Sequence, residues 1–269
     1  MRTTWLVVLG GCLAWPCSAQ IKGAHARGEE PTIILGLTAG YLFQAPLFEV
    51  GNQLFPPSDF PDQFDTLRLR RGTRYSTTFG VSIAYFPKPH FGLSGEVGYL
   101  GIGTDGSCQL RASPLSSETV RMCQSADTAR TNASAMMIAV GGTYRALSRS
   151  AFSPFLSFKV GAMLSAENPN RWYASYFIED RFILLRLFDD ESQTASGWYA
   201  QAGLGFSILA APGYRMRFEA RDNILRLPIP SGPSDPSRSI YPRTSVIKHL
   251  ISINFGFDIV LQAKPGRRY

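Results

Sequence analysis

The clearest pattern in the chain is a strict alternation of apolar and polar positions at 246–261, which reads VIKHLISINFGFDIVL. Side chains of a β-strand point alternately to opposite faces, so this stretch has one bulky apolar face and one face of small or polar residues. Strands of soluble domains usually run about 5–6 residues, whereas a tilted strand crosses a bilayer in about 9–11. The length and the alternation therefore predict a membrane-spanning strand with its apolar face outward.

Seven further stretches alternate in the same way. The connections between successive stretches are alternately short, tight turns and long, polar loops. Their inward faces are rich in Gly, Ser and Ala, which fit the lumen of a narrow barrel where side chains from every strand converge. We predict an all-β fold, an eight-stranded antiparallel up-and-down transmembrane β-barrel with short periplasmic turns and long outer loops. The seven strands are 32–43, 73–86, 91–102, 131–147, 154–166, 194–210 and 214–225, and the long loops are 44–72, 103–130, 167–193 and 227–244.

Two of these loops carry unusual sequences. Four prolines in 44–72 argue against a central strand there. The segment 171–188, RWYASYFIEDRFILLRLF, is unusually aromatic and aliphatic for a loop. It is either a ribbon formed by extension of the flanking strands, a short amphipathic helix on the barrel rim, or a surface that binds a ligand or partner. A further pair of strands, giving a ten-stranded barrel, is another alternative.

Composition agrees with a chain that alternates between lipid and lumen. Charged residues make up 17% and aromatic residues 12%, and the mean hydropathy is −0.03. Beyond the N-terminus no apolar run is long enough for a membrane helix. The N-terminus predicts a secretory signal with Arg2, an apolar stretch and cleavage after Ala19, which changes the net charge from +7 to +6. A lipoprotein signal ending at Cys12 is the alternative.

The predicted organisation is therefore a signal peptide, a short leader, one barrel and a polar tail. These segments are 1–19, 20–31, 32–262 and 263–269. Cys108 and Cys123 remain after cleavage, and an even pair of cysteines in an exported chain predicts a disulfide. No histidine or carboxylate cluster accompanies them, so we predict neither a metal site nor a cofactor.

The last strand also carries a recognisable motif: a polar residue, a glycine two positions on, then two hydrophobic residues spaced by one. These are Asn254, Gly256, Ile259 and Leu261. On this motif the mature chain resembles the small eight-stranded outer-membrane barrels related to OmpA and OmpX, and the "outer membrane protein beta-barrel domain" group. The resemblance implies a bacterial outer-membrane location and recognition by the barrel-assembly machinery. The tail 262–269 departs from members that end on an aromatic residue.

Several charged residues fall on the inward-facing positions of the predicted strands. Since eight strands leave an interior just wide enough for side chains to fill, we predict a plugged lumen held by ion pairs. Basic residues outnumber acidic ones, so an anion-favouring pore or transporter is the alternative. The predicted set is Arg74, Glu96, Arg145, Lys159, Arg215, Arg217, Glu219, Arg221, Lys248 and Asp258.

Catalytic residues are not evident. The three histidines are His25 in the leader, His90 in a turn and His249 on the lipid-facing side of the last strand. None is expected to have a Ser or carboxylate partner suited to nucleophilic catalysis. We therefore predict a non-enzymatic, monomeric outer-membrane protein with a structural, envelope-integrity or surface-interaction role. Outer-membrane lipid and a ligand at the outer loops are the expected partners, nucleic acid is not, and a lipid-modifying enzyme is a third alternative.

Overall fold

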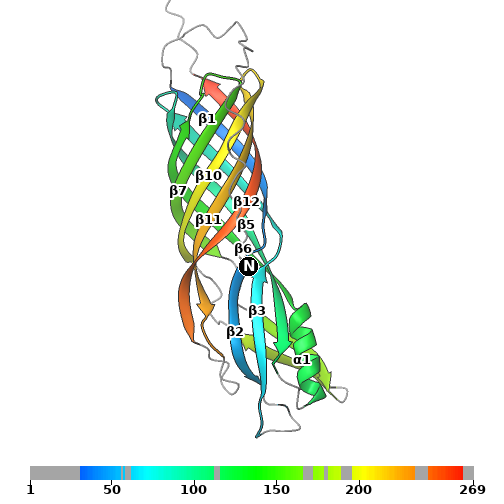
Figure 1. The fold of residues 1–269 in the computed structure, drawn as a ribbon. Coiled ribbons are helices and arrows are strands. Elements are labelled where there is room, and N and C mark those ends of the chain that lie inside the picture. The colour runs from blue at the N-terminus through cyan, green and yellow to red at the C-terminus, as the bar shows by residue number, and fades with distance from the viewer. Residues whose placement is uncertain are drawn as a thin grey trace, which may run out of the picture.

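A computed structural model of the protein describes residues 31–55, 57, 62–111, 116–165, 172–178, 181–188, 196–233 and 242–262. Eight antiparallel strands close into a ring in the order β1-β4-β5-β6-β7-β10-β11-β12 and back to β1. The predicted eight-stranded up-and-down barrel is confirmed, and the tilted wall is the upper body in Figure 1. The ring strands are β1 Thr32–Leu42, β4 Ser76–Phe86, β5 Phe91–Leu110, β6 Arg130–Arg145, β7 Phe152–Ser165, β10 Ser196–Ala211, β11 Tyr214–Pro230 and β12 Arg243–Gln262.

Register and burial follow the sequence alternation. β1 is paired on both sides: Ala39 lies opposite Phe255 of β12 and Phe79 of β4. On β12 the predicted outward residues Ile253 and Phe255 are 55% and 45% exposed, whereas Asn254 between them is 3% exposed. Short connections join β4 to β5, β6 to β7 and β10 to β11, and we call this end of the barrel the turn end. The opposite end is the loop end.

The loop end continues into a second folded body, which we call the cap (Figure 1). The cap comprises five elements and the loop-end extensions of β5, β11 and β12. β5 runs on to Leu110 and pairs with β3, while β11 and β12 remain paired as far as Pro230 and Arg243. The five elements are β2 Pro46–Phe55, β3 Asp65–Thr73, α1 Ser117–Thr128, β8 Trp172–Ile178 and β9 Arg181–Phe188.

The prediction of an irregular loop at 44–72 is wrong, because β2 and β3 form a hairpin there. The prolines are compatible with it for a physical reason. Pro46 is the first residue of β2, and β2 pairs on one side only, with β3. A first residue or an edge position needs no N–H for the ladder, so proline is tolerated.

The described residues of 171–188 form neither a short helix nor an extension of the flanking strands. β8 and β9 pair only with each other and form a separate two-stranded sheet, so they neither extend β7 and β10 nor join the ring. The ten-stranded alternative is therefore wrong. The predicted loop 103–130 contains α1, which begins after Ser116, whose hydroxyl accepts a hydrogen bond from the Glu118 backbone. In the described part of the chain no helix is both long and apolar enough to span a membrane.

Candidate functional site

Four charged side chains meet in the middle of the barrel interior, each at most 8% exposed. Glu96 of β5 pairs with the ammonium of Lys159 on β7 and with Arg221 on β11, whose Nη1 lies 2.6 Å from Glu96 Oε1. Arg221 also reaches Glu219, with Nη2 2.8 Å from Oε2. Two carboxylates thus face two cations. Because a buried charge without a partner costs several kcal/mol, this balance is what allows all four to lie inside.

Neutral polar groups complete this layer. Ser157 donates to Glu219 at 2.7 Å, and the Gln201 amide oxygen, with the amide turned toward the guanidinium, accepts from Arg221 Nε at 3.1 Å. Thr78 donates to Asn254 Oδ1 at 2.8 Å. Between these groups is a cavity of about 10 Å³, about the smallest volume that holds a single water. The middle of the interior is thus filled by side chains.

The turn end of the interior is richer in positive charge. Arg217 lies 3.6 Å from Asp258, measured between Nη2 and Oδ1. Arg215 donates to the Ser150 carbonyl at 3.1 Å, while Arg145 stacks over the ring of Phe86 with 3.7 Å to the centroid. Three arginines thus face one aspartate among the described residues of this layer. The contacts of Arg145 and Arg215 with turn carbonyls anchor the turns, and the excess of two positive charges makes this end attractive to anions.

The loop-end half of the interior is apolar, which the sequence reading of a polar lumen missed. Leu100 and Ile102 of β5, Met163 of β7 and Leu225 of β11 are at most 1% exposed and point inward. They belong to one continuous hydrophobic core with the cap residues Phe48, Trp172 and Phe188. The barrel interior and the cap therefore share a core rather than meeting across a gap.

Trp172 of β8 is the centre of the cap core. Its indole N–H donates to the Ala126 carbonyl of α1 at 3.2 Å, and its ring lies 6.4 Å from Phe48 and 6.2 Å from Phe188. The guanidinium of Arg71 on β3 stacks 5.3 Å from the ring centroid. A tryptophan that contacts four elements in this way fixes their relative positions.

Arg71 is an unusual member of that core because it is 2% exposed. Its Nη2 donates to Thr104 at 2.7 Å, and Nε and Nη1 have no hydrogen-bond partner among the described residues. Burial lowers the pKa of Arg71 to about 10, and the negative charge of Asp105 acts in the opposite direction. The group therefore stays charged at neutral pH, compensated mainly by Asp105 and the Trp172 ring.

Helix α1 is attached to the cap by polar contacts and one covalent bond. The predicted disulfide between Cys108 on β5 and Cys123 on α1 is present. Tyr176 of β8 donates to Glu118 Oε1 at 3.1 Å, and burial, with Glu118 adding to it, raises the pKa of the Tyr176 phenol. The Thr119 hydroxyl donates to Asp65 of β3. The helix is thus held by three different elements.

One face of the β8–β9 hairpin is apolar and uncovered. Phe177, Phe182 and Leu184 are 59%, 61% and 56% exposed, and the two phenyl rings lie edge to face with 5.4 Å between centroids. The guanidinium of Arg121 on α1 donates to the Phe177 carbonyl at 3.0 Å. Exposed apolar groups held by a rigid scaffold are typical of contact surfaces.

The outer wall of the barrel carries two bands of aromatic rings separated by aliphatic and phenyl side chains. Such girdles mark the two interfaces of a transmembrane barrel. At the loop end Tyr41 stacks on Tyr75 at 5.3 Å, and at the turn end Phe91 lies 4.9 Å from Tyr144. The loop-end girdle is Tyr41, Phe43, Tyr75, Tyr99 and Trp198, and the turn-end girdle is Tyr85, Phe91, Tyr144, Phe152 and Tyr214.

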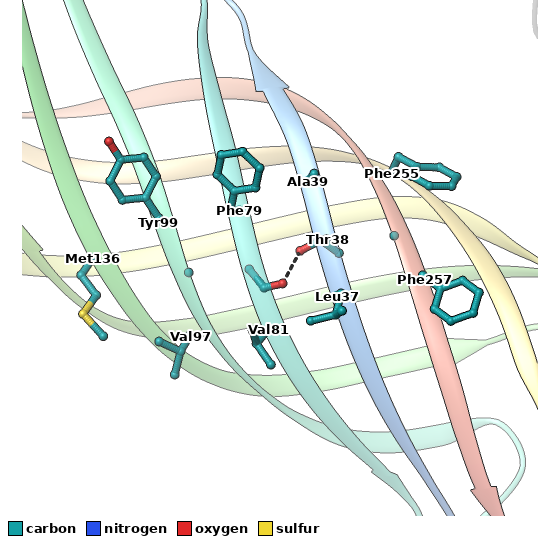
Figure 2. Close-up of a pocket in the computed structure, with 13 residues that line it drawn as sticks. Leu37, Thr38, Ala39, Phe79, Val81, Val97, Tyr99, Met136, Phe255 and Phe257 are labelled. Atoms are coloured by element: carbon teal, nitrogen blue, oxygen red, sulfur yellow. Dashed lines mark hydrogen bonds between the residues drawn. The ribbon is translucent and has the colours of Figure 1, made fainter.

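A groove of about 690 Å³ lies on this wall between the two girdles (Figure 2). It forms because Ala39 is small and is flanked in register by Phe79 on one side and Phe255 on the other. Figure 2 shows the larger side chains standing around it, with Thr38 bonded to the Gly80 carbonyl at 3.3 Å. The lining is almost wholly apolar, so the groove suits contact with a hydrocarbon chain.

Two of the predicted lumen residues lie elsewhere. Arg74 falls between β3 and β4, where the alternation is interrupted, and it packs over Gly103 and donates to Asn132 at 2.6 Å on the outer side of the wall. Lys248 is at the loop-end rim, where its ammonium donates to the Pro46 carbonyl at 3.0 Å. The other eight line the interior, as described above.

One of the three histidines has a carboxylate neighbour that the sequence did not reveal. His249 of β12 and Asp222 of β11 both face outward near the loop end, and His249 Nδ1 lies 2.7 Å from Asp222 Oδ2. The pair joins positions 27 residues apart and depends on the register between β11 and β12. A long connection rather than a tight turn joins these two strands, so the sequence alone does not give that register.

The motif residues of the last strand divide between the two faces. Asn254 is buried and Gly256 lies against Thr38 and Arg217, whereas Ile259 and Leu261 face outward at 37% and 48% exposure. The predicted cleavage at Ala19, the leader and the tail 263–269 lie outside the described residues. Groups of three or more His, Cys, Asp or Glu residues that could hold a metal ion do not occur within the described ranges.

No family model and no curated protein matches the chain. Solved structures align along most of it at low identity. OprG from Pseudomonas aeruginosa is 11% identical, with 87% of this chain and 97% of that chain covered and a TM-score of 0.43. Ail, the attachment invasion locus protein of Yersinia pestis, is 10% identical over 87% and 100%, with a TM-score of 0.39.

The N-terminal β-barrel domain of Pseudomonas aeruginosa OprF is 9% identical, with 87% and 100% of the two chains covered and a TM-score of 0.37. All three are small outer-membrane barrels. The predicted likeness to this class holds at the level of the fold. At such low identity the likeness concerns architecture alone, so the function has to be argued from this chain's own residues.

Proposed function

We propose that this protein is an outer-membrane barrel with a plugged lumen, whose rigid cap contacts ligands or partners outside the cell. The outer-membrane location is supported by the two aromatic girdles and the apolar band between them. Export through a signal cleaved after Ala19, recognition of the last strand by the barrel-assembly machinery, and a monomeric state belong to the same proposal. We assign the protein no catalytic role.

The observation that carries this proposal is the continuous core from the barrel interior into the cap. Leu100 and Leu225 inside the barrel join Trp172 and Phe188 in the cap, and below them Glu96 and Arg221 fill the middle layer. A solute would have to displace both an apolar core and a balanced ion network. The cap is also covalently fixed by Cys108–Cys123, and such rigidity suits a contact surface better than a gate.

Conductance of the purified protein in a planar bilayer tests the plugged lumen, with a heat-dependent gel shift as the control for folding. We expect a folded protein without discrete steps. A matched variant in which 172–188 is replaced by a short turn tests the cap. We expect that variant to insert normally and to lose the adhesion of expressing cells to surfaces coated with extracellular-matrix proteins. Equal adhesion by both chains would contradict a role for this hairpin.

An anion-favouring pore is the second candidate, and one observation favours it. Among the described residues of the turn end, Arg145, Arg215 and Arg217 face one carboxylate, that of Asp258, so this layer has an excess of positive charge. Discrete anion-selective steps that decrease in Arg215→Gln and Arg217→Gln would support the pore and contradict the plug. Because both arginines contact the barrel's own residues, the gel shift must first show that each variant is folded.

A further inference from the structure

Three polar residues, Asp222, Arg226 and His249, stand on the membrane-facing side of β11 and β12, close to the loop-end girdle. Asp222 and Arg226 alternate along β11 with the buried residues Asn223 and Leu225, so both point outward. His249 of β12 is paired with Ile224, which lies between them. Charged side chains on this wall are costly at the membrane midplane and nearly free at the interface. Their position near the girdle places them at headgroup depth.

The surrounding residues show where the interface lies. Trp198 of β10 precedes Tyr199, which is paired with Leu225, so Trp198 and Arg226 occupy neighbouring outward-facing positions on adjacent strands. Trp is enriched where the polar headgroups begin. On the turn-end side the wall is apolar, with Leu204 62% exposed and Ile251 46% exposed. A lipid with its acyl chains over these residues would place its headgroup beside Arg226 and His249.

The two basic groups are available to such a headgroup. The carboxylate of Asp222 holds His249 through Nδ1 at 2.7 Å, and the His249 side chain is still 59% exposed, which leaves its Nε2 edge free. Asp222 contacts the imidazole through Oδ2 and thereby orients it, while its Oδ1 has no hydrogen-bond partner in the described part of the chain. Arg226 is exposed, and its side chain forms no ion pair with a described residue.

We propose that Arg226, His249 and Trp198 form a binding site for the phosphate group of an outer-leaflet lipid headgroup. A guanidinium presents paired N–H donors that match phosphate oxygens, the imidazole edge adds a second contact, and the indole fixes the depth. The site faces the bilayer, so its ligand is a lipid and not a soluble phosphate. This inference needs the barrel to span a membrane but is independent of any partner of the cap.

Tryptophan fluorescence can test the site, because Trp198 is part of it and Trp172 is buried in the cap. The full chain, purified from membranes, is placed in phosphatidylcholine vesicles containing either brominated phosphatidylglycerol or brominated phosphatidylcholine. Bromine quenches an indole only on contact. We expect stronger quenching by the anionic lipid, and a Trp198→Phe variant identifies the part of the signal that comes from this site.

The double variant Arg226→Gln/His249→Gln should abolish this preference. An arginine near an anionic surface contributes about 1 kcal/mol, so the single variant Arg226→Gln should lower the relative affinity about fivefold. Arg74→Gln is the matched control, since Arg74 is a rim arginine on the outer side of the wall beside β5 and β6. Equal quenching by both lipids in the wild type, or a preference unchanged in the double variant, would overturn the proposal.

Discussion

In the turn-end half of the barrel the strands are joined across the interior by buried ion pairs, whereas the loop-end half is filled by apolar side chains that continue into the cap. In the first half Glu96, Lys159 and Arg221 each depend on a specific partner. In the second, Leu100 and Trp172 pack against many neighbours of the same kind. The same ring of strands thus encloses two different kinds of interior.

The difference matters because the two kinds of packing respond differently to change. A buried ion network is close to neutral in stability when complete and strongly destabilising when one member is lost. An apolar core loses stability roughly in proportion to the volume removed. Variants in each half should therefore affect different regions of the molecule, and two readouts can separate them: the heat-dependent gel shift for the barrel and protease resistance for the cap.

Removing the shared carboxylate of the ion network should have the largest effect. Glu96→Gln leaves the Lys159 ammonium without its partner and Arg221 with Glu219 alone, so we expect a loss of about 3–5 kcal/mol. Urea unfolding in lipid vesicles, followed by the gel shift, measures it. Glu49→Gln, followed by protease resistance because Glu49 lies in the cap, is the control for an exposed ion pair. Glu49 pairs with Arg68 and Arg70 while 36% exposed, so its loss should change stability by about 0–1 kcal/mol. Equal losses in the two variants would contradict the distinction.

Truncating the central side chain of the cap should be nearly as costly but local. Trp172→Ala removes a fully buried indole and its bond to Ala126, so we expect the cap to lose about 3–5 kcal/mol. Limited proteolysis should then cut within α1 or β8 while the gel shift is retained. Phe177→Ala on the exposed face of the same hairpin should stay within about 0.5 kcal/mol. A barrel that unfolds together with the cap in Trp172→Ala would show that the shared core couples them.

Removing the disulfide should have a smaller effect, again confined to the cap. Cys108 and Cys123 are 15 residues apart, and closing a loop of that length contributes about 3 kcal/mol on the chain-entropy model. Cys108→Ser/Cys123→Ser should increase the rate of proteolysis at α1 without changing the gel shift. Reduction of the wild type should reproduce this result. If reduction does not change the rate of proteolysis but the double variant does, the serine substitutions destabilise the cap and the disulfide does not stabilise it.

The sequence predicts the barrel well and the cap poorly, for a physical reason. Membrane-facing strands must show a period of two, so Ile253, Asn254 and Phe255 reveal their faces from sequence alone. The cap is stabilised by contacts between distant segments, such as Trp172 with Ala126. Because of the prolines in 44–72, the sequence did not predict the hairpin there. Because of the polar composition of 117–128, it did not predict the helix, whose one local signal is the Ser116 N-cap.

The residues of the candidate site differ in the same way in how far the sequence predicts them. Inward parity identified eight of the charged interior residues, because parity is a local property. It misplaced Arg74, which follows the irregular corner between β3 and β4. The pairing of Asp222 with His249 depends on the register of two strands, which the alternation itself does not encode. Leu100 and Ile102, by contrast, have inward parity within the predicted strand 91–102, and the prediction of a polar lumen overlooked them.

A crowded glycine in the ionic half should give the smallest of these effects. A Cβ added at Gly40 would lie 2.0 Å from Asn254 Oδ1, and Asn254 cannot move freely because its side chain is bonded to Thr78 and Ser252. We expect Gly40→Ala to cost about 1–3 kcal/mol by overpacking, visible as a lower urea midpoint in the gel-shift assay. Gly95→Ala is the matched control: its Cβ would meet only Ile83 at 3.7 Å and should change stability by no more than about 0.5 kcal/mol. If both variants were neutral, the interior would have to contain more free space around Asn254 than its hydrogen bonds allow. The ionic layer would then be less tightly packed than the apolar core.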